Sequence, residues 1–280
     1  MSTSTYQFDV ETAVGAGEQP DDRSPVRFDT TISARWNIGD NPNGGYLAAS
    51  SLRAMAELAG HPDPLSVTTH YLRPGTGDEP GEIHGRLIRL GRRATTTSAE
   101  LHQAGTQRLQ TVAAFGDLGD PDRADDEPAS TSPSLSLAPV PLPEPDSCVD
   151  RRALAQGVEL PILDRLDVRI DPRWSVAGAA DRAEVSGWIR FADGRPPDSK
   201  SLVLFADAFP PSVFSLLGTI GWVPTLELTV HVRRRPAPGW IRARFTTYDL
   251  SNGMLIENGQ LWDSTGRLVA QSRQLALLLV

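Results

Sequence analysis

The sequence predicts an α+β fold made of two tandem copies of one unit. In each unit an antiparallel sheet wraps a helix, and the two sheets join into one. Three observations lead to this prediction. The chain has 280 residues, 39% of them hydrophobic, which is enough for one large domain or two modest ones. One order of helix and strands occurs twice along the chain, and the two copies keep a fixed register.

The first copy begins with a helix expected over about 44–60. The run Asn-Pro-Asn-Gly-Gly opens this helix, and Gly60 is placed to cap its end. Four strand-like runs separated by proline or glycine follow the helix, at 65–73, 81–90, 94–102 and 107–116. A further strand is expected before the helix, at 28–36.

The second copy repeats this order. A helix-like run at 199–209 follows a strand candidate at 184–191. Four more strand-like runs come after it, at 225–234, 239–249, 254–263 and 267–279.

A fixed offset of 161 residues relates the two copies. It pairs Leu65 with Leu226, Val67 with Leu228, Thr68 with Thr229, His70 with His231, Arg73 with Arg234, and Gly105 with Gly266. We therefore expect a duplicated unit rather than a solenoid of short repeats. A long helix followed by four antiparallel strands buries its apolar face only if the sheet curls around it. This is the hot-dog arrangement, expected here in duplicate.

The two predicted halves are separated by a segment rich in aspartate, serine and proline. Such a composition buries too little apolar surface to offset its ordering entropy, which favours a linker. We therefore expect an N-terminal hot-dog at 1–117, a linker at 118–162 and a C-terminal hot-dog at 163–280. The linker is expected to contribute little to catalysis.

Charge and cysteine content exclude several classes of protein. A net charge of −8 disfavours nucleic acid as a partner. Cys148 is the single cysteine, so no intramolecular disulfide forms, which fits a reducing, cytoplasmic location. The N-terminus lacks a signal-peptide pattern, and no apolar run is long enough to span a membrane.

Polar residues that occur in only one copy are candidates for function. The offset matches Asp207 with Tyr46, Thr225 with Pro64, and Gln274 with Ala113. Asp207 is expected within an apolar helical run, where a carboxylate is costly unless it is partnered. The alternative is an ordinary solvated aspartate next to Pro210-Pro211.

Strand parity places Gln274 on the inward face. It alternates in phase with Ala270 and Ala276, whereas Gln271 shares the opposite face with Arg273. Gln274 is therefore either a catalytic amide or a structural one. The hydroxyl of Thr225 either orients a ligand or caps the local turn.

Several motifs in both halves resemble one known family. They are NPNGGYLAAS, HYLRPG at 70–75, FADAF, PTLELTVHVRR and GRLVAQSRQ. Together they are similar to the type II (TesB-like) acyl-CoA thioesterases, whose signature is Tyr-Phe-Leu-Arg-Pro-Gly. The resemblance implies a double hot-dog, an acyl-CoA substrate and a homo-oligomer. It also implies that Asp207, Thr225 and Gln274 are the catalytic residues.

The implied chemistry is direct attack of water on a thioester. Asp207 would activate the water, while Thr225 and Gln274 hold it in line. Backbone amides near Gly45 and Tyr46 are candidates for stabilising the oxyanion. No metal or organic cofactor is required, and no histidine spacing typical of a metal site is visible.

The arginines leave two interpretations open. Arg73, Arg233 and Arg234 either bind the phosphates of coenzyme A or keep strand ends soluble.

Two other functions compete with hydrolysis. One is a hot-dog hydratase or dehydratase, and the other is a catalytically weak acyl-CoA-binding protein. The sequence has no Gly-x-Ser-x-Gly motif, so an α/β-hydrolase mechanism is not expected.

Overall fold

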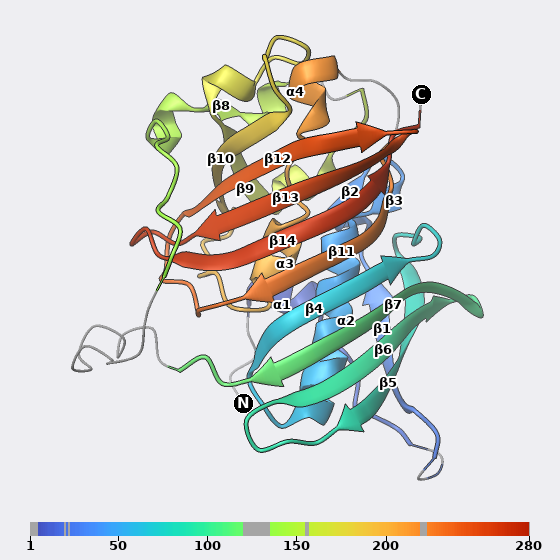
Figure 1. Ribbon diagram of the computed structural model, residues 1–280. Helices are drawn as coiled ribbons and strands as arrows, with labels where there is room; N and C mark the ends of the chain where they lie inside the picture. Colours follow the sequence, from blue (N-terminus) through green and yellow to red (C-terminus); the bar gives the residue numbers. More distant parts are fainter. Residues whose placement is uncertain are drawn as a thin grey trace, which may run out of the picture.

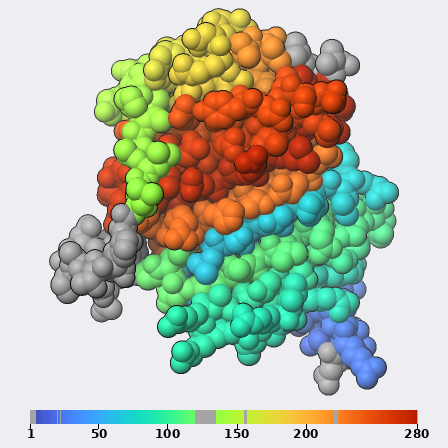
Figure 2. Space-filling model, viewed as in Figure 1, coloured from blue at the N-terminus to red at the C-terminus, as the bar shows by residue number. Residues whose placement is uncertain are grey.

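The computed structural model describes residues 5–19, 21, 23–119, 135–154, 157–218 and 223–279. Its main feature is one antiparallel sheet of 12 strands in the order β1-β5-β6-β7-β4-β11-β14-β13-β12-β10-β9-β8 (Figure 1). The two halves of the chain meet where β4 lies beside β11. The space-filling view shows these two strands, cyan and orange, running side by side (Figure 2). The predicted double hot-dog with one continuous sheet is confirmed.

The first half contains the long helix α2, which spans Gly44–Ala59 and lies behind the sheet (Figure 1). Its strands are β1 (Val26–Ile32), β4 (Asp63–Tyr71), β5 (Glu79–Arg89), β6 (Thr95–Gln103) and β7 (Thr106–Gly116). The Asn43 side chain caps α2 by accepting a hydrogen bond from the Tyr46 amide at 2.9 Å. Gly60, with φ of 65°, ends the helix, as its position in the sequence predicts.

The remaining elements of the first half are short. They are α1 (Gln7–Glu11), η1 (Ala34–Trp36), β2 (Asn37–Ile38) and β3 (Asn41–Pro42).

The second half supplies the other seven strands of the large sheet. They are β8 (Val149–Asp150), β9 (Leu166–Ile170), β10 (Glu184–Phe191), β11 (Thr225–Val232), β12 (Ile241–Ser251), β13 (Met254–Trp262) and β14 (Leu268–Leu277). Its 3-10 helices are η3 (Pro145–Ser147), η4 (Arg151–Ala153), η5 (Pro161–Asp164) and η6 (Pro172–Trp174).

The helix of the second half differs from the prediction. Instead of one helix over 199–209, the chain forms α3 (Ser201–Phe205) and α4 (Val213–Leu217) with turns between them. Pro210 and Pro211 account for the break, because proline has no amide hydrogen and disfavours helical geometry in the residue before it. Asp207 consequently lies in the turn after α3, not in the middle of a helix.

The predicted offset of 161 residues holds at the junction of the two halves. Thr68 lies directly opposite its counterpart Thr229, and their hydroxyl oxygens are 2.9 Å apart. The same offset relates the pairing of β4 with β7 to that of β11 with β14. A single approximate two-fold axis through this pair therefore relates the repeats. One buried apolar cluster includes side chains from both, such as Val67 and Val230.

The described part of the predicted linker packs against the second half. The indole of Trp188 donates a hydrogen bond to the Pro143 carbonyl at 2.8 Å, and that of Trp262 donates to the Leu137 carbonyl at 2.9 Å. Strand β8 then adds to the edge of the sheet. The segment lies on the sheet because these indoles use its backbone carbonyls as acceptors. Residues 120–134 of the predicted linker lie outside the described residues.

Within the described ranges, α2 is the longest helix, and none of the helices combines the length and the apolar character needed to cross a membrane.

Candidate active site

A cavity of about 350 Å³ lies where the end of β4 meets the start of β11. Its wall combines the first turn of α2, the turn after α3 and the chain just beyond β8. Asp207, Thr225 and Gln274 all line this cavity, although they are far apart in the sequence. The structure therefore brings the three residues singled out by their asymmetry between the repeats to one place.

Asp207 is held by residues from the other half of the chain. Its Oδ2 accepts hydrogen bonds from the Gly45 amide at 2.7 Å and from the Asn43 side chain at 3.0 Å. Asn43 also donates to the Asp207 carbonyl at 2.8 Å. A Cβ at position 45 would lie 2.9 Å from the Asp207 Cβ and 2.9 Å from the Val203 carbonyl oxygen. The Asn-Gly-Gly run is thus needed both to cap α2 and to let the carboxylate approach.

Burial raises the pKa of Asp207 to about 7. The hydrogen bond from Gly45 lowers this pKa, the nearby charge of Glu257 raises it, and the bond from Asn43 lowers it. Glu257 also lines the cavity, and burial raises its own pKa, although the Ser212 amide donates to its Oε2 at 2.6 Å. A carboxylate with a pKa near neutrality, in reach of a cavity, is suited to accept a proton.

Thr225 and Gln274 form a pair on the same cavity wall. The Gln274 side-chain amide donates a hydrogen bond to the Thr225 hydroxyl oxygen at 2.6 Å. Gln274 is partly buried, whereas Gln271 and Arg273 are exposed, so the predicted parity of β14 is confirmed. Since Gln274 donates to this hydroxyl, the Thr225 proton is free to point to a ligand.

The amides expected to form an oxyanion site are already engaged. Gly45 donates to Asp207, and the Tyr46 amide donates to the cap residue Asn43. Tyr46 is fully buried and does not line the cavity. Both amides therefore have partners within the protein, the carboxylate of Asp207 and the capping residue Asn43, and their role in an oxyanion site stays a prediction. The amide of Gly44 remains without a partner among the described residues, and Gly44 lines the cavity.

Of the predicted arginines, only Arg73 reaches the site. It is exposed and lines the cavity at the end of β4. Arg233 and Arg234 follow the other end of β11, about 26 Å from Thr225 along the strand. Arg234 instead donates to the Leu268 carbonyl at 3.0 Å. The structure does not bring Arg233 and Arg234 to the cavity, because β4 and β11 are antiparallel and equivalent arginines lie at opposite ends of the junction.

The opposite end of the junction is closed by an ion pair between a buried carboxylate and a partly buried arginine. Asp63, at the start of β4, is 3% exposed and lies 2.8 Å from Arg235. The Ser199 hydroxyl also donates to Asp63 at 2.7 Å. The two symmetry-related ends have therefore become different: one holds the cavity, and the other a polar clamp between the halves.

Sequence reasoning missed two further polar groups on the cavity wall. Tyr71 has a buried hydroxyl without a partner among the described residues. Burial and the charge of Asp207 raise its pKa. Tyr71 stands in HYLRPG where the family signature has phenylalanine. The sequence therefore already showed a hydroxyl that the signature lacks. Glu257 alternates in phase with the buried Leu255 and Leu261 of β13, a second signal that was available.

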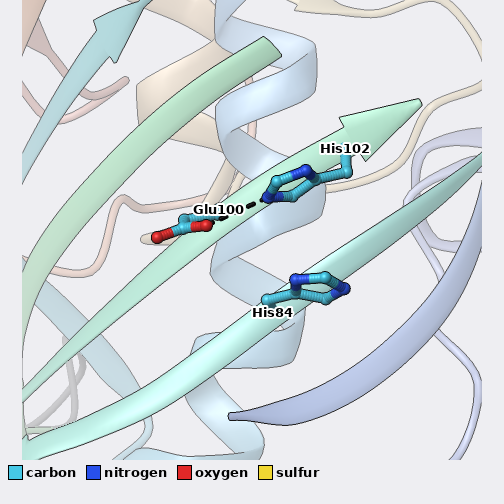
Figure 3. Close-up of side chains that lie close together, drawn as sticks. All are labelled: His84, Glu100 and His102. Carbon is cyan, nitrogen blue, oxygen red and sulfur yellow. Dashed lines mark hydrogen bonds and ion pairs between the residues drawn. The ribbon is translucent and has the colours of Figure 1, made fainter. Parts of the chain in front are cut away.

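A separate cluster of potential metal ligands lies on the outer face of β5 and β6 (Figure 3). We call His84, Glu100 and His102 the outer-face cluster. Their ligand atoms lie within 4.8 Å of one another, and the His102 Nε2 is 3.0 Å from Glu100. The sequence spacing did not reveal it, because His84 faces Glu100 across two paired strands. None of the three lines the cavity.

Comparisons with known proteins cover both halves. The profile of the acyl-CoA thioesterase N-terminal domain matches residues 32–117, and that of the C-terminal domain matches residues 136–278.

Three individual proteins illustrate the similarity. A protein from Thermobifida fusca, assigned as a thioesterase II, is 31% identical, with 98% of each chain covered and a TM-score of 0.83. A hot-dog protein of unknown function from Alicyclobacillus acidocaldarius is 23% identical, with 99% of each chain covered and a TM-score of 0.80. An uncharacterized protein of Mycobacterium tuberculosis is 29% identical, with 90% of each chain covered.

Proposed function

Because the chain belongs to the acyl-CoA thioesterase family, we propose that it hydrolyses an acyl-CoA at the cavity around Asp207. The observation that carries the proposal is the environment of this carboxylate. It has a pKa of about 7, lines a cavity and shares the wall with the hydrogen-bonded pair of Thr225 and Gln274. Such a base is largely ionised just above neutral pH and still accepts a proton well.

The proposed reaction uses water as the nucleophile. Thr225 and Gln274 hold the water, and Asp207 takes one of its protons as the oxygen bonds to the thioester carbon. The carbon–sulfur bond then breaks, and the proton passes from Asp207 to the departing thiolate of coenzyme A. The products are the free acid and coenzyme A.

The remaining parts of the cavity suit the other parts of the substrate. The unpartnered amide of Gly44 is available to stabilise the developing oxyanion. Phe209, Phe214 and Phe245 provide an apolar wall for an acyl chain. The exposed Arg73 is available to a phosphate of coenzyme A.

The proposal is tested by free-thiol release from a panel of saturated and unsaturated acyl-CoAs. Release from several saturated substrates supports hydrolysis. Water addition to an unsaturated acyl-CoA without thiol release would favour the hydratase. Tight binding without either reaction would favour the acyl-CoA-binding protein.

We expect Tyr71→Phe to lower kcat about 10-fold without loss of stability. The hydroxyl is buried near Asp207 and has no partner among the described residues, so its removal relieves a desolvation cost. A hydrogen bond that it forms to charge in the reaction would be worth about 1.5–3 kcal/mol. The measurements are kcat and the melting temperature.

Tyr46→Phe is the matched control for Tyr71→Phe. The Tyr46 hydroxyl donates to the Glu11 carbonyl at 2.6 Å and accepts from the Ser33 amide at 3.0 Å. Its removal should lower the melting temperature and leave kcat unchanged. A Tyr71→Phe variant with full kcat would mean that the hydroxyl takes no part in the reaction.

We expect chelation of metals to leave turnover unchanged. The outer-face cluster lies on the side of the sheet opposite the buried Ile83 and Leu101, away from the cavity. The test is thiol release before and after dialysis against EDTA, for the unmodified protein and for His84→Ala. A loss that Zn²⁺ restores in the unmodified protein, but not in His84→Ala, would contradict the metal-free reaction.

A further inference from the structure

The cavity wall contains a buried cation, Arg151, that forms no ion pair with any carboxylate of the described residues. Arg151 is 3% exposed, and it lines the same cavity as Asp207. Its Nη1 donates to the Ala208 carbonyl, while its Nε is buried without a partner. Burial lowers the pKa of Arg151 to about 10, and no charged neighbour opposes this effect. Within the described ranges, no carboxylate forms an ion pair with it.

A second buried arginine shows how the same protein balances such a charge elsewhere. Arg195 is 8% exposed and lies outside the cavity wall. Its guanidinium contacts Asp9 at 2.8 Å and Asp198 at 2.6 Å. Buried arginines are almost always paired, since an isolated charge in a protein interior costs several kcal/mol. Arg151 departs from this rule, and it does so at the wall of a cavity that a ligand can enter.

The free part of the guanidinium has the shape of a carboxylate receptor. Nη1 is engaged by a backbone carbonyl, which fixes the plane of the group. Nε and Nη2 form the side edge of the guanidinium; Nε is buried without a partner, and Nη2 makes no hydrogen bond to any of the described residues. Two parallel N–H groups on this edge match the two oxygens of a carboxylate.

The position of Arg151 favours the acyl group over coenzyme A as the source of the anion. Arg151 is buried and shares the cavity wall with Leu160 and Phe209, whereas Arg73 is the exposed arginine. Phosphates are large, strongly hydrated groups that bind near a cavity mouth, while an acyl chain enters the apolar interior.

We propose that Arg151 binds a carboxylate at the far end of the acyl group, so that ω-carboxyacyl-CoA thioesters are the preferred substrates. This inference rests on the proposed thioesterase function, and it names the substrate class of that site.

The first test compares matched substrates with the unmodified protein. Butanoyl-, hexanoyl- and octanoyl-CoA are each paired with the ω-carboxy form of the same length, succinyl-, adipoyl- and suberoyl-CoA. We expect kcat/KM to be at least about 10-fold higher for the ω-carboxy member of one pair. Equal or higher values for the plain substrate in every pair would overturn the proposal.

The second test uses Arg151→Met, which keeps an unbranched apolar stem and removes the guanidinium with its charge. We expect about a 100-fold loss of kcat/KM for the ω-carboxy substrate and a change of only a few-fold for the plain one. Arg151→Lys should retain part of the preference. If Arg151→Met fails to fold, the substrate comparison and Arg151→Lys still decide the matter.

Arg152→Met is the matched control. Arg152 is the next residue, its guanidinium is paired with Asp150 at 3.0 Å, and it does not line the cavity. Both substrates should be turned over by this variant as by the unmodified protein.

A structural role for Arg151 predicts a different result. If the arginine only positions the Ala208 carbonyl, Arg151→Met would slow both members of each pair equally, and the proposal would be wrong. If it binds a phosphate of coenzyme A, the loss would again be equal, and it would vanish with N-acetylcysteamine thioesters, which lack phosphates. A carboxylate preference that persists with those thioesters supports the acyl group as the source.

Failure of the thioesterase function itself remains distinguishable. If no acyl-CoA is hydrolysed, the intact thioesters become stable ligands, and calorimetry compares adipoyl-CoA with hexanoyl-CoA. Tighter binding of adipoyl-CoA that is lost in Arg151→Met supports the carboxylate site, while equal affinities overturn it.

Discussion

Replacing Asp207 with asparagine should lower kcat at least about 100-fold, because general-base catalysis contributes roughly this factor or more. Asparagine keeps the shape of the side chain and can still accept the bond from Gly45. Only the proton acceptor is lost. The measurement is thiol release at several pH values with a saturating acyl-CoA.

The pH dependence provides an independent check on the same residue. The pKa of Asp207 is raised to about 7, so the base is ionised above that pH and protonated below it. Turnover of the unmodified protein should therefore fall as the pH drops through 7, and the residual activity of Asp207→Asn should lack this inflection. An undiminished rate in a folded Asp207→Asn protein would place the base elsewhere.

Asp63→Asn is the control at the opposite end of the junction. Asp63 is buried and paired with Arg235, which also contacts Asp117 at 3.2 Å, so the substitution removes the buried one of these two carboxylates and weakens the link between the halves. The melting temperature should fall, while kcat measured below that temperature should stay within a few-fold of the unmodified value.

The second large effect is expected from Thr225 and Gln274 acting together. Thr225→Val and Gln274→Ala should each lower kcat about 10-fold, and the double variant should be little worse than the more damaging single one. The reason is the hydrogen bond of 2.6 Å between their side chains: loss of either releases the other from its position. Rates from the four proteins of this cycle give the coupling directly.

Gln271→Ala controls for changes to β14 itself. Gln271 is exposed on the opposite face of the strand, so its removal should leave kcat unchanged. Fully additive effects of Thr225→Val and Gln274→Ala would show that the two side chains do not hold one water molecule.

The repeat was readable from the sequence because packing constrains both copies in the same way. Thr68 and Thr229 lie on the axis between the halves, and there the offset of 161 holds. Farther from the axis the offset changes to 160. There the pair of Ile83 with Leu101 in the first half corresponds to the pair of Ala243 with Leu261 in the second. A single register can therefore be extrapolated safely only over the strands nearest the junction.

The details of the site were less accessible for physical reasons. The offset could flag Asp207 as asymmetric, but it could not show that Pro210 and Pro211 would leave it in a turn facing Gly45. The amide of Tyr46 donates a hydrogen bond to the capping side chain of Asn43, and the sequence pattern alone does not reveal this bond.

Arg151 escaped attention because composition assigned its segment to a linker. Its importance depends on a missing partner, and a missing ion pair cannot be read from a linear sequence. The ends of strands posed a similar problem. Arg73 and Arg234 occupy equivalent positions in the two repeats. They lie at opposite ends of the junction because β4 and β11 pair antiparallel, and so only Arg73 lines the cavity.

The contact between Asp207 and the first turn of α2 joins the two repeats at one end of their junction. Asp207, the proposed base, belongs to one repeat, and its two donors, Asn43 and Gly45, belong to the other, so neither repeat alone holds all the residues of the proposed centre. If two identical chains formed the same junction, its two ends would be identical, and every substitution would appear at both. In a single chain, each end can carry residues of its own. One end holds the cavity with Asp207, and at the other the ion pair of Asp63 with Arg235 links the repeats.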